Sequence, residues 1–433
     1  MIVPSRRLLL AFLVAAVPLC AAVTLSPQLA VLWLGLTTGT AALLAWDAYR
    51  SMGLAKQVSL TTPPLLKLSR GRSGTLGFLF SNPSPKALRL RFSVSFPRGL
   101  SSSREPCSLA IPARSESVYP VEVTGTERGR FQVASCPLES VSQFGFWLVR
   151  ETFPLRLEVQ VYPNLAKNAV AAALLSRKHA GLRSQRQVGK GREFEKLREY
   201  SAGDAFDEVH WKATARRGKP IVKVFQIERA QELYVLIDTS RHSRRHHTLD
   251  HFVEAALILG IAAQRVGDQF GVLTFSDRVH DFVRAKAGTA HYTQCRNAIY
   301  AAQPRPVSVD FPELTTFLQT HLRKRALLFV LANLDDPYAA ETLTSELSLL
   351  SKRHLVVAAS LRQPWINLMF EGPRPESLDD VYAAVAGHVF WHKTEELTRT
   401  FRSYGAELTL CTPINIYAQL TDKYLRLKQR QVL

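Results

Sequence analysis

The pattern of apolar positions first predicts a pair of helices at the amino terminus. Two long apolar runs, Leu8–Val23 and Leu29–Trp46, each have about the length that crosses a bilayer as a helix. A cleaved signal peptide is the alternative for the first run, but the second run directly after it disfavours that interpretation. The flanks of the pair are basic, whereas the link between the runs carries no charge: Arg6, Arg7, Arg50 and Lys56. We therefore predict a transmembrane hairpin over residues 1–50 at a bacterial inner membrane, with the remaining domains cytoplasmic.

From Ser59 onward, apolar and polar residues alternate in short runs that Gly, Pro, Ser and Asn separate. Alternation of this kind is typical of half-buried strands. The runs recur roughly every ten residues without helical segments between them, which predicts an immunoglobulin-like β-sandwich over residues 51–163. No cluster of His, Asp or Cys occurs there, so we expect a structural or protein-binding module. The expected strands are Thr75–Phe80, Leu88–Phe96, Ser117–Val123, Gly129–Ala134 and Leu155–Tyr162.

The last region alternates apolar strands with segments of helical periodicity. It begins after a basic connector, residues 164–230, and covers residues 231–433. Uninterrupted apolar strands that alternate with helices predict a parallel, doubly wound α/β sheet. Ligands of such sheets bind where the strands end. Four polar residues would meet there, and they form the best candidate ligand site in the chain: Asp238, Ser240, Asp277 and Asn333.

The net charge and the residue composition indicate which kinds of molecule the protein could bind. The formal net charge is +19, which favours anionic partners such as a membrane surface, nucleic acid or an acidic protein face. Few aromatic residues lie among the basic residues of the connector, so a groove for single-stranded nucleic acid is not expected. The five cysteines show no CxxC spacing, which argues against a disulfide framework or a zinc site.

A charged and aromatic motif precedes the α/β region. It comprises Glu193-Phe194, Leu197-Arg198-Glu199-Tyr200, Gly203-Asp204 and His210-Trp211-Lys212-Ala213-Thr214-Ala215-Arg216. The motif resembles the signature of the bacterial family of the domain of unknown function 58, whose carboxyl half is von Willebrand factor A-like. The step Phe206–Trp211 departs from the usual form of the family. The resemblance makes seven residues candidates for binding a partner: Arg198, Glu199, Tyr200, Asp204, Trp211, Lys212 and Arg216. Trp211 itself is expected to pack against the strands that follow it.

The resemblance also implies a metal site of the Asp-x-Ser-x-Ser type, followed by a Thr and a later Asp. Asp238 and Ser240 match this pattern, but His242 replaces the second Ser, and Ser243 lies one residue too far along. Asn333 stands where the later Asp is expected. Thr289 and Ser308 are weak candidates for the Thr. Because Mg²⁺ prefers six oxygen ligands, we expect a degenerate site at Asp238, Ser240 and Asn333, with Mg²⁺ as the candidate cofactor.

Three functions remain open. Members of the resembled family are commonly encoded beside MoxR-type AAA+ ATPases, so the first is a non-enzymatic adaptor for such an ATPase or its client. No Ser-His-Asp, paired-carboxylate or P-loop pattern occurs in the sequence, which favours this class. The second is a metal-dependent phosphatase or nuclease that uses Asp238, Asp277 and Asp335. The third is a basic protein that binds nucleic acid.

Overall fold

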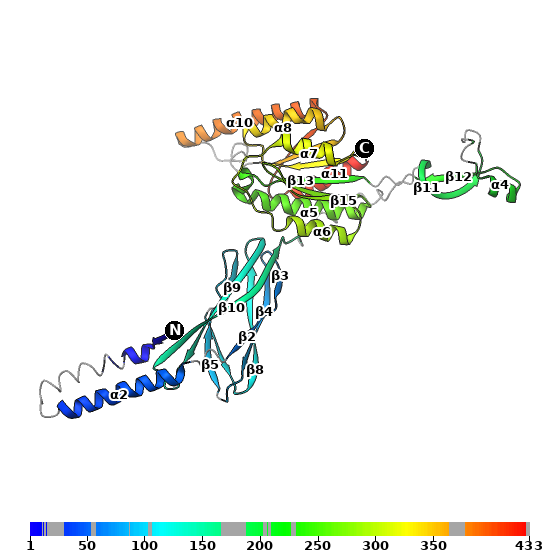
Figure 1. Cartoon of the computed structure of the whole chain (residues 1–433). Helices are drawn as coiled ribbons and strands as arrows, with labels where there is room; N and C mark the ends of the chain where they lie inside the picture. The colour runs from blue at the N-terminus through cyan, green and yellow to red at the C-terminus, as the bar shows by residue number, and fades with distance from the viewer. Residues whose placement is uncertain are drawn as a thin grey trace. The chain divides into compact units, whose positions relative to one another are not determined.

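The computed structural model of the chain (Figure 1) consists of two compact units, Met1–Tyr162 and Pro163–Leu433. Each unit contains hydrophobic core of its own. The structure describes residues 1–10, 12, 14, 30–52, 58–85, 87–102, 106–165, 188–201, 206, 209–226, 231–362 and 377–429.

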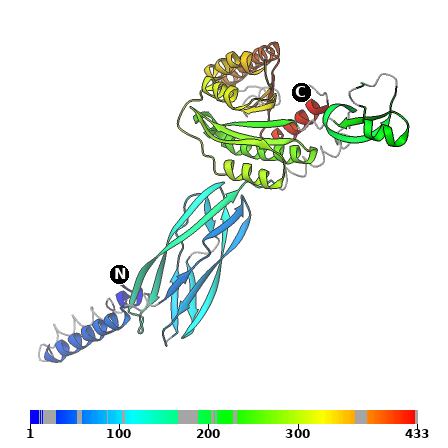
Figure 2. The same ribbon diagram turned by 45° about the vertical axis from the view of Figure 1, so that its right-hand side comes forward.

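The first unit contains two β-sheets that share one core. The six-stranded sheet has the order β1-β10-β9-β5-β7, with β3 also paired to β10, and the four-stranded sheet has the order β2-β4-β8-β6. Figure 2 shows the two sheets face to face. The strands are β1 (Ile2–Pro4), β2 (Ser59–Thr61), β3 (Leu65–Ser69), β4 (Ser73–Asn82), β5 (Leu88–Phe92), β6 (Leu100–Ser102), β7 (Cys107–Ile111), β8 (Ser115–Gly125), β9 (Gly129–Val141) and β10 (Trp147–Tyr162).

Strand β5 shows how the sequence builds this core. Its residues alternate between buried apolar and exposed basic side chains, because successive side chains of a strand point to opposite faces. Phe92 at its end packs between two rings of the opposite sheet. The ring centroids of Phe78 and Phe80 lie 5.7 and 4.9 Å from that of Phe92. This aromatic cluster joins the two sheets.

Helix α2 (Ala30–Ser51) covers the second apolar run of the amino terminus. Its carboxyl-terminal end is tied to the turn between β9 and β10. The buried Asp47 carboxylate accepts a hydrogen bond from Ser142 Oγ at 2.8 Å, and Trp147 Nε1 donates to the Leu44 carbonyl at 3.0 Å. The end of α2 is therefore part of the first unit.

The described part of the chain has no helix that is both long enough and apolar enough to cross a membrane. This finding contradicts the predicted transmembrane hairpin, and the inner-membrane location inferred from it loses its support. The physical reason within α2 is the polar content of the helix, which includes Thr37, Thr38, Thr40 and the buried Asp47. Most of the first apolar run, Leu8–Val23, lies outside the described residues.

The motif before the α/β region forms a small module. Strands β11 (Val188–Glu199) and β12 (Ile221–Gln226) pair in antiparallel fashion, and helix α4 (Trp211–Arg217) lies between them in sequence. The His210 imidazole begins α4, where its Nδ1 accepts a hydrogen bond from Ala213 N at 3.0 Å. Gly218 ends the helix with φ of 67°, a left-handed conformation that glycine adopts without strain.

A six-stranded sheet organises the rest of the second unit. Its order is β15-β14-β13-β16-β17-β18, in which only β15 runs antiparallel to its neighbour. The strands are β13 (Glu232–Asp238), β14 (Gln269–Phe275), β15 (Val279–Lys286), β16 (Leu327–Leu331), β17 (Leu355–Leu361) and β18 (Glu407–Cys411). The central strands are apolar along their whole length because both faces of the sheet are covered.

Helices cover both faces of this sheet (Figure 2). One core contains Val235 and Ile237 of β13 together with α5, α6 and α11. The other contains Tyr234 and Leu236 of the same strand together with α7, α8 and α10. The helices are α5 (Thr248–Val266), α6 (Thr289–Ile299), α7 (Phe311–His321), α8 (Pro337–Leu350), α10 (Leu378–Ser403) and α11 (Ile416–Gln429), and a 3₁₀ helix, η5 (Arg241–His247), follows β13.

Candidate functional site

The carboxyl end of β13 carries a buried carboxylate. Asp238 is almost fully buried, and its Oδ1 accepts a hydrogen bond from Ser240 N at 2.7 Å. Its Oδ2 accepts a hydrogen bond from Ser243 Oγ at 3.2 Å. Burial raises the pKa of Asp238, and the hydrogen bonds from Ser240 and Ser243 oppose that shift.

The 3₁₀ helix η5 places Ser243 beside Asp238. The spacing in sequence is one residue longer than the Asp-x-Ser-x-Ser pattern. However, η5 begins directly after Ser240, and Ser243 N donates to the Ser240 carbonyl at 3.1 Å. This tight turn directs the Ser243 hydroxyl to the carboxylate. His242, which occupies the expected position of the second Ser, instead contacts Asp336, with Nε2 and Oδ2 separated by 3.6 Å.

Asn333 lies at the same edge of the sheet, after β16. Its Nδ2 donates to the His242 carbonyl at 3.4 Å, and its Oδ1 accepts a hydrogen bond from Asp335 N at 3.1 Å. The structure therefore brings Asn333 to the loop that holds Asp238. The amide orders the two loops through these hydrogen bonds.

Other sequence candidates are placed less favourably. Asp277 is exposed and accepts a hydrogen bond from Ser276 Oγ at 2.7 Å, which lowers the pKa of Asp277. Thr289 follows strand β15, which runs antiparallel to β14. It therefore lies near the amino-terminal ends of the parallel strands, whereas Asp238 lies at their carboxyl-terminal ends. Ser308 is exposed and follows Val307, whose carbonyl accepts a hydrogen bond from Arg241 N at 2.9 Å. Hydrogen bonds thus join the Asp238 loop to Val307, next to Ser308, and also to Phe275, two residues before Asp277.

Within the described residues, no group of three or more His, Cys, Asp and Glu side chains is arranged to hold a metal ion. Asp238, Asp277 and Asp335 are therefore not gathered into a cluster of three carboxylates. A cation at this edge would depend on the oxygens of Asp238, Ser240 and Ser243. The Ser240 Oγ is buried and has no hydrogen-bond partner in the described structure. These oxygens fit part of the ligand set of a hard cation.

The β11–α4–β12 module presents a second candidate site. Trp211 is 58% exposed, and its ring packs edge-on against Phe206, which is 73% exposed, with 5.2 Å between the ring centroids. The expectation that Trp211 packs against the following strands is therefore wrong. Among the side chains of the module that the structure describes, Val209, Ile221 and Val222 are buried apolar residues.

The remaining partner-binding candidates lie close to Phe206 and Trp211 in the sequence. Lys212 and Arg216 are exposed on α4, and the exposed Glu199 forms an ion pair with Lys219 at 3.3 Å. Tyr200 is also exposed, and its backbone N donates to the Pro220 carbonyl at 3.0 Å. Arg198 Nη1 donates to the Glu199 carbonyl at 3.1 Å. Asp204 lies outside the described residues. Phe206 was not among the candidates, although an aromatic residue five positions before Trp211 was a usable signal.

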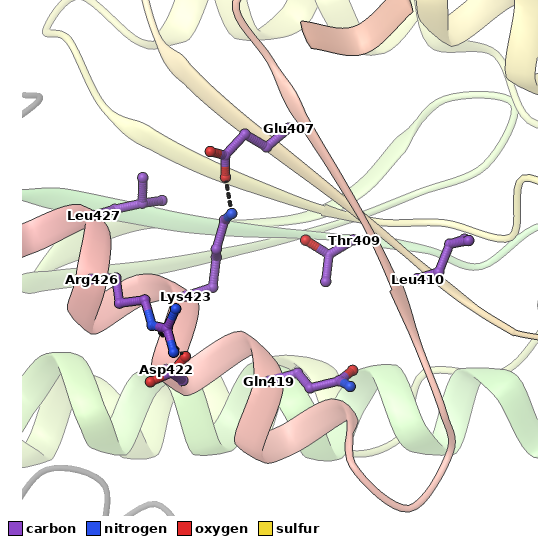
Figure 3. A pocket seen from close by; sticks show the side chains of 8 residues that line it. All are labelled: Glu407, Thr409, Leu410, Gln419, Asp422, Lys423, Arg426 and Leu427. Atoms are coloured by element: carbon purple, nitrogen blue, oxygen red, sulfur yellow. Dashed lines mark ion pairs between the residues drawn. The ribbon is translucent and has the colours of Figure 1, made fainter. Parts of the chain in front are cut away.

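A groove of about 290 Å³ lies between β18 and α11 (Figure 3). Its acidic and basic side chains form ion pairs with one another: Glu407 pairs with Lys423, and Asp422 pairs with Arg426. A catalytic acid or base needs a side chain that is available to a substrate. These contacts favour a structural role for the four residues.

A protein-family model matches the central part of the chain. Residues 196–368 match the family described as Protein of unknown function DUF58. The DUF58 match includes most of the β11–α4–β12 module, the Asp238 loop and Asn333. No curated protein matches the chain.

Similarities to solved structures are weak. The native conformation of E. coli alpha-2-macroglobulin is 11% identical, with a TM-score of 0.21, over 25% of this chain and 7% of that chain. Proximal thread matrix protein 1 from the mussel byssus is 12% identical, with a TM-score of 0.28, over 46% of this chain and 45% of that chain. A second structure of that protein, with a zinc-occupied MIDAS motif, is 15% identical, with a TM-score of 0.24, over 31% and 36%. The chain thus spans less than half the length of each, and these likenesses assign neither fold nor function.

Proposed function

We propose that this protein is a non-enzymatic adaptor whose DUF58 region binds a protein partner through the β11–α4–β12 module. The observation that carries the proposal is the exposed ring pair of Phe206 and Trp211. Large exposed aromatic side chains that contact each other are typical anchors of protein interfaces, because a partner removes their apolar surface from water.

The charge around the rings favours an acidic partner surface. Helix α4 carries Lys212, Arg216 and Arg217, all exposed, and no acidic residue in its first turn. Such a basic rim speeds encounter with an acidic face and selects against basic ones. The family resemblance supplies the class of partner, a MoxR-type AAA+ ATPase or its client protein.

The test is affinity purification with the tagged full-length chain as bait in a lysate of the source cells, followed by mass spectrometry. We expect an AAA+ ATPase in near-stoichiometric amount with the wild-type bait and its loss with Trp211→Ala. Truncating a central aromatic anchor costs about 2 kcal/mol or more of binding free energy, or roughly a thirtyfold loss of affinity. The melting temperature of the variant should stay close to that of the wild type, because the ring is exposed.

Tyr338→Ala is the matched control. Tyr338 is 72% exposed on α8, outside the module, so its removal should leave recovery of the ATPase unchanged. An ATPase that is recovered equally with wild type, Phe206→Ala and Trp211→Ala would contradict the proposed surface. Recovery of the bait without any ATPase would contradict the proposed partner.

A second candidate function is binding of Mg²⁺ at the Asp238 loop, and the buried Ser240 hydroxyl without a hydrogen-bond partner favours it. Asp238, Ser240 and Ser243 would hold the ion, with the remaining ligands from water or from a partner. Bound Mg²⁺ would supply positive charge that a carboxylate of the partner recognises.

Thermal unfolding of the full chain, with and without Mg²⁺ after treatment with a chelator, tests this second function. Bound Mg²⁺ stabilises the folded state by about 2.7 kcal/mol when its concentration is about 100 times Kd. We expect the melting temperature to rise in the wild type and in Asp277→Ala, and to be insensitive to Mg²⁺ in Ser240→Ala and Asp238→Asn. The absence of any shift in the wild type at millimolar Mg²⁺ would exclude a functional site.

A further inference from the structure

Helix α10 has apolar residues on two different faces. Leu397 and Phe401, near its carboxyl-terminal end, pack into the core shared with α7 and α8. Five apolar residues of its amino-terminal half remain 45–76% exposed, and we call them the α10 stripe: Leu378, Val381, Tyr382, Val385 and Val389. Figure 1 shows this half of α10 extending past the other helices of the α/β domain.

The spacing of the α10 stripe is that of a helix–helix contact. At about 100° per residue, the five side chains fall within an arc of roughly 100°, turned away from Leu397 and Phe401. Leu378, Tyr382, Val385 and Val389 follow one another at intervals of four, three and four residues. This alternation is the seam of a coiled coil, in which each side chain packs between residues of a second helix.

The amino-terminal end of α10 is fixed independently of a partner. Ser377 Oγ accepts a hydrogen bond from Asp380 N at 3.2 Å, and Asp380 Oδ2 accepts one from Ser377 N at 3.0 Å. This reciprocal capping box stabilises the first turn of the helix. The stripe is therefore presented on a formed helix, which lowers the entropic cost of docking.

Charges beside the stripe indicate what covers it. Asp379 and Lys393 are both exposed, and the helical periodicity places them on the same flank of the stripe, near its two ends. A second copy of α10 in antiparallel orientation, centred near Ala386, would bring Asp379 of each copy close to Lys393 of the other. It would also bring Val385 beside Val389 of the other copy. In a parallel pair the same flank of each helix faces opposite sides of the seam, so Asp379 and Lys393 would not pair across it.

We propose that two copies of this protein associate through antiparallel pairing of their α10 stripes. The interface consists of the stripe residues at its centre and the Asp379–Lys393 pairs at its ends. Each copy contributes only about three helical turns, so the association is expected to depend on concentration.

Sedimentation velocity of the full-length chain over a range of concentrations tests the proposal. The wild type should shift from monomer to dimer as its concentration rises. Val385→Asp should raise the dimer dissociation constant by about tenfold or more, because it places a carboxylate in an apolar contact. Ser345→Asp, which adds the same charge at an exposed position of α8, is the matched control and should dimerise like the wild type.

Charge reversal identifies the second copy as the occupant. Asp379→Lys and Lys393→Asp should each weaken the dimer, and the double variant should recover it, because both charge pairs are restored with opposite polarity. A chain that stays monomeric at every concentration would overturn the proposal. A dimer that Val385→Asp leaves intact would also overturn it. The same holds if the double variant dimerises more weakly than either single charge reversal, because the two losses of affinity would then add instead of cancelling.

Disulfide cross-linking tests the orientation without relying on a destabilising variant. In a Cys20→Ser background, the cysteines of the described residues are all buried: Cys107, Cys136, Cys295 and Cys411. Ala386→Cys should form a covalent dimer under mild oxidation, because the two copies of this position meet near the centre of the antiparallel pair. Glu395→Cys, farther along α10, should not. Equal cross-linking at both positions would contradict the antiparallel register.

Discussion

His354, directly before β17, is a buried imidazole whose charged form the fold disfavours. Only 3% of its surface is exposed, and its Nδ1 accepts a hydrogen bond from Ala326 N at 3.3 Å. Its Nε2 is buried and has no hydrogen-bond partner in the described structure. Burial, reinforced by Arg353 and Arg325, lowers the pKa of His354 below 6.5. A proton on this ring would place a positive charge in the interior near Arg353 and Arg325.

We therefore expect His354 to reduce stability in mild acid. A histidine whose pKa is lower in the folded state binds more protons when unfolded. Its stabilising contribution is complete above the unfolded pKa of 6.5 and is lost as the pH falls below that value. Urea unfolding of wild type and His354→Gln at pH 7.5 and 5.5 measures the effect. The variant should be less stable at pH 7.5 because the hydrogen bond to Ala326 changes, and the difference should shrink at pH 5.5. A difference that is equal at both pH values would contradict this assignment.

At the Asp238 loop, some of the residues that come together could be identified from the sequence and others could not. Asp238 and Ser240 were identifiable because an apolar strand that ends in Asp-x-Ser places these groups at the edge of a parallel sheet. Ser243 lies one residue beyond the second Ser of the Asp-x-Ser-x-Ser pattern. It still reaches Asp238 because the chain after Ser240 forms a 3₁₀ helix, which the sequence pattern does not reveal. The partner of His242, Asp336, is 94 positions later in sequence, and only the pairing of β13 with β16 brings them together.

At the scale of elements, helix α11 is fastened to the sheet by a buried charge. The Asp268 side chain lies at the start of β14 and is fully buried. It receives hydrogen bonds from Lys428 Nζ at 2.6 Å and Tyr424 Oη at 2.5 Å, both from α11, and from Gln231 N at 3.1 Å. Burial and the neighbouring Asp268 carboxylate raise the pKa of Tyr424, so its hydroxyl remains a donor.

Lys428→Met should destabilise the α/β domain strongly. Removal of one partner leaves the Asp268 carboxylate buried without its ion pair, which costs about 3 kcal/mol or more. The double variant Asp268→Asn with Lys428→Met should recover part of this loss, because no buried charge remains. Urea unfolding of both variants and the wild type measures the two differences. A single variant as stable as the wild type would show that α11 is held by its apolar contacts alone.

Helices and strands were predictable where their pattern of apolar residues indicated one type of secondary structure. The continuous apolar run of β13 and the helical spacing of apolar residues in α5 predicted both elements. The amino terminus was misinterpreted because an apolar run long enough for a bilayer also suits a helix whose end packs on protein, as Asp47 and Trp147 show for α2. Trp211 was expected to pack against the strands that follow it, and the sequence does not reveal that α4 has no buried residue.

At the scale of the whole molecule, the pairing of strands that are distant in sequence was harder to predict than local structure. Alternation of apolar and polar residues predicts a strand in either unit, but it does not predict which other strands pair with it. The pairing of β3 with β10, for example, joins Leu65 to Glu158. The high net charge indicates anionic partners but carries no information about which surface meets them.

The order of strands in the α/β sheet has a consequence for biosynthesis. Strand β13 leaves the ribosome before the other strands of this sheet, and it occupies an interior position with β14 on one side and β16 on the other. Each later strand can therefore add to an open edge, and none has to insert between two that are already paired. In the first unit, by contrast, β10 pairs with β1, about 150 residues earlier in the chain, so that sheet closes only when its last strand has been synthesised. The α/β domain can thus assemble as it is translated.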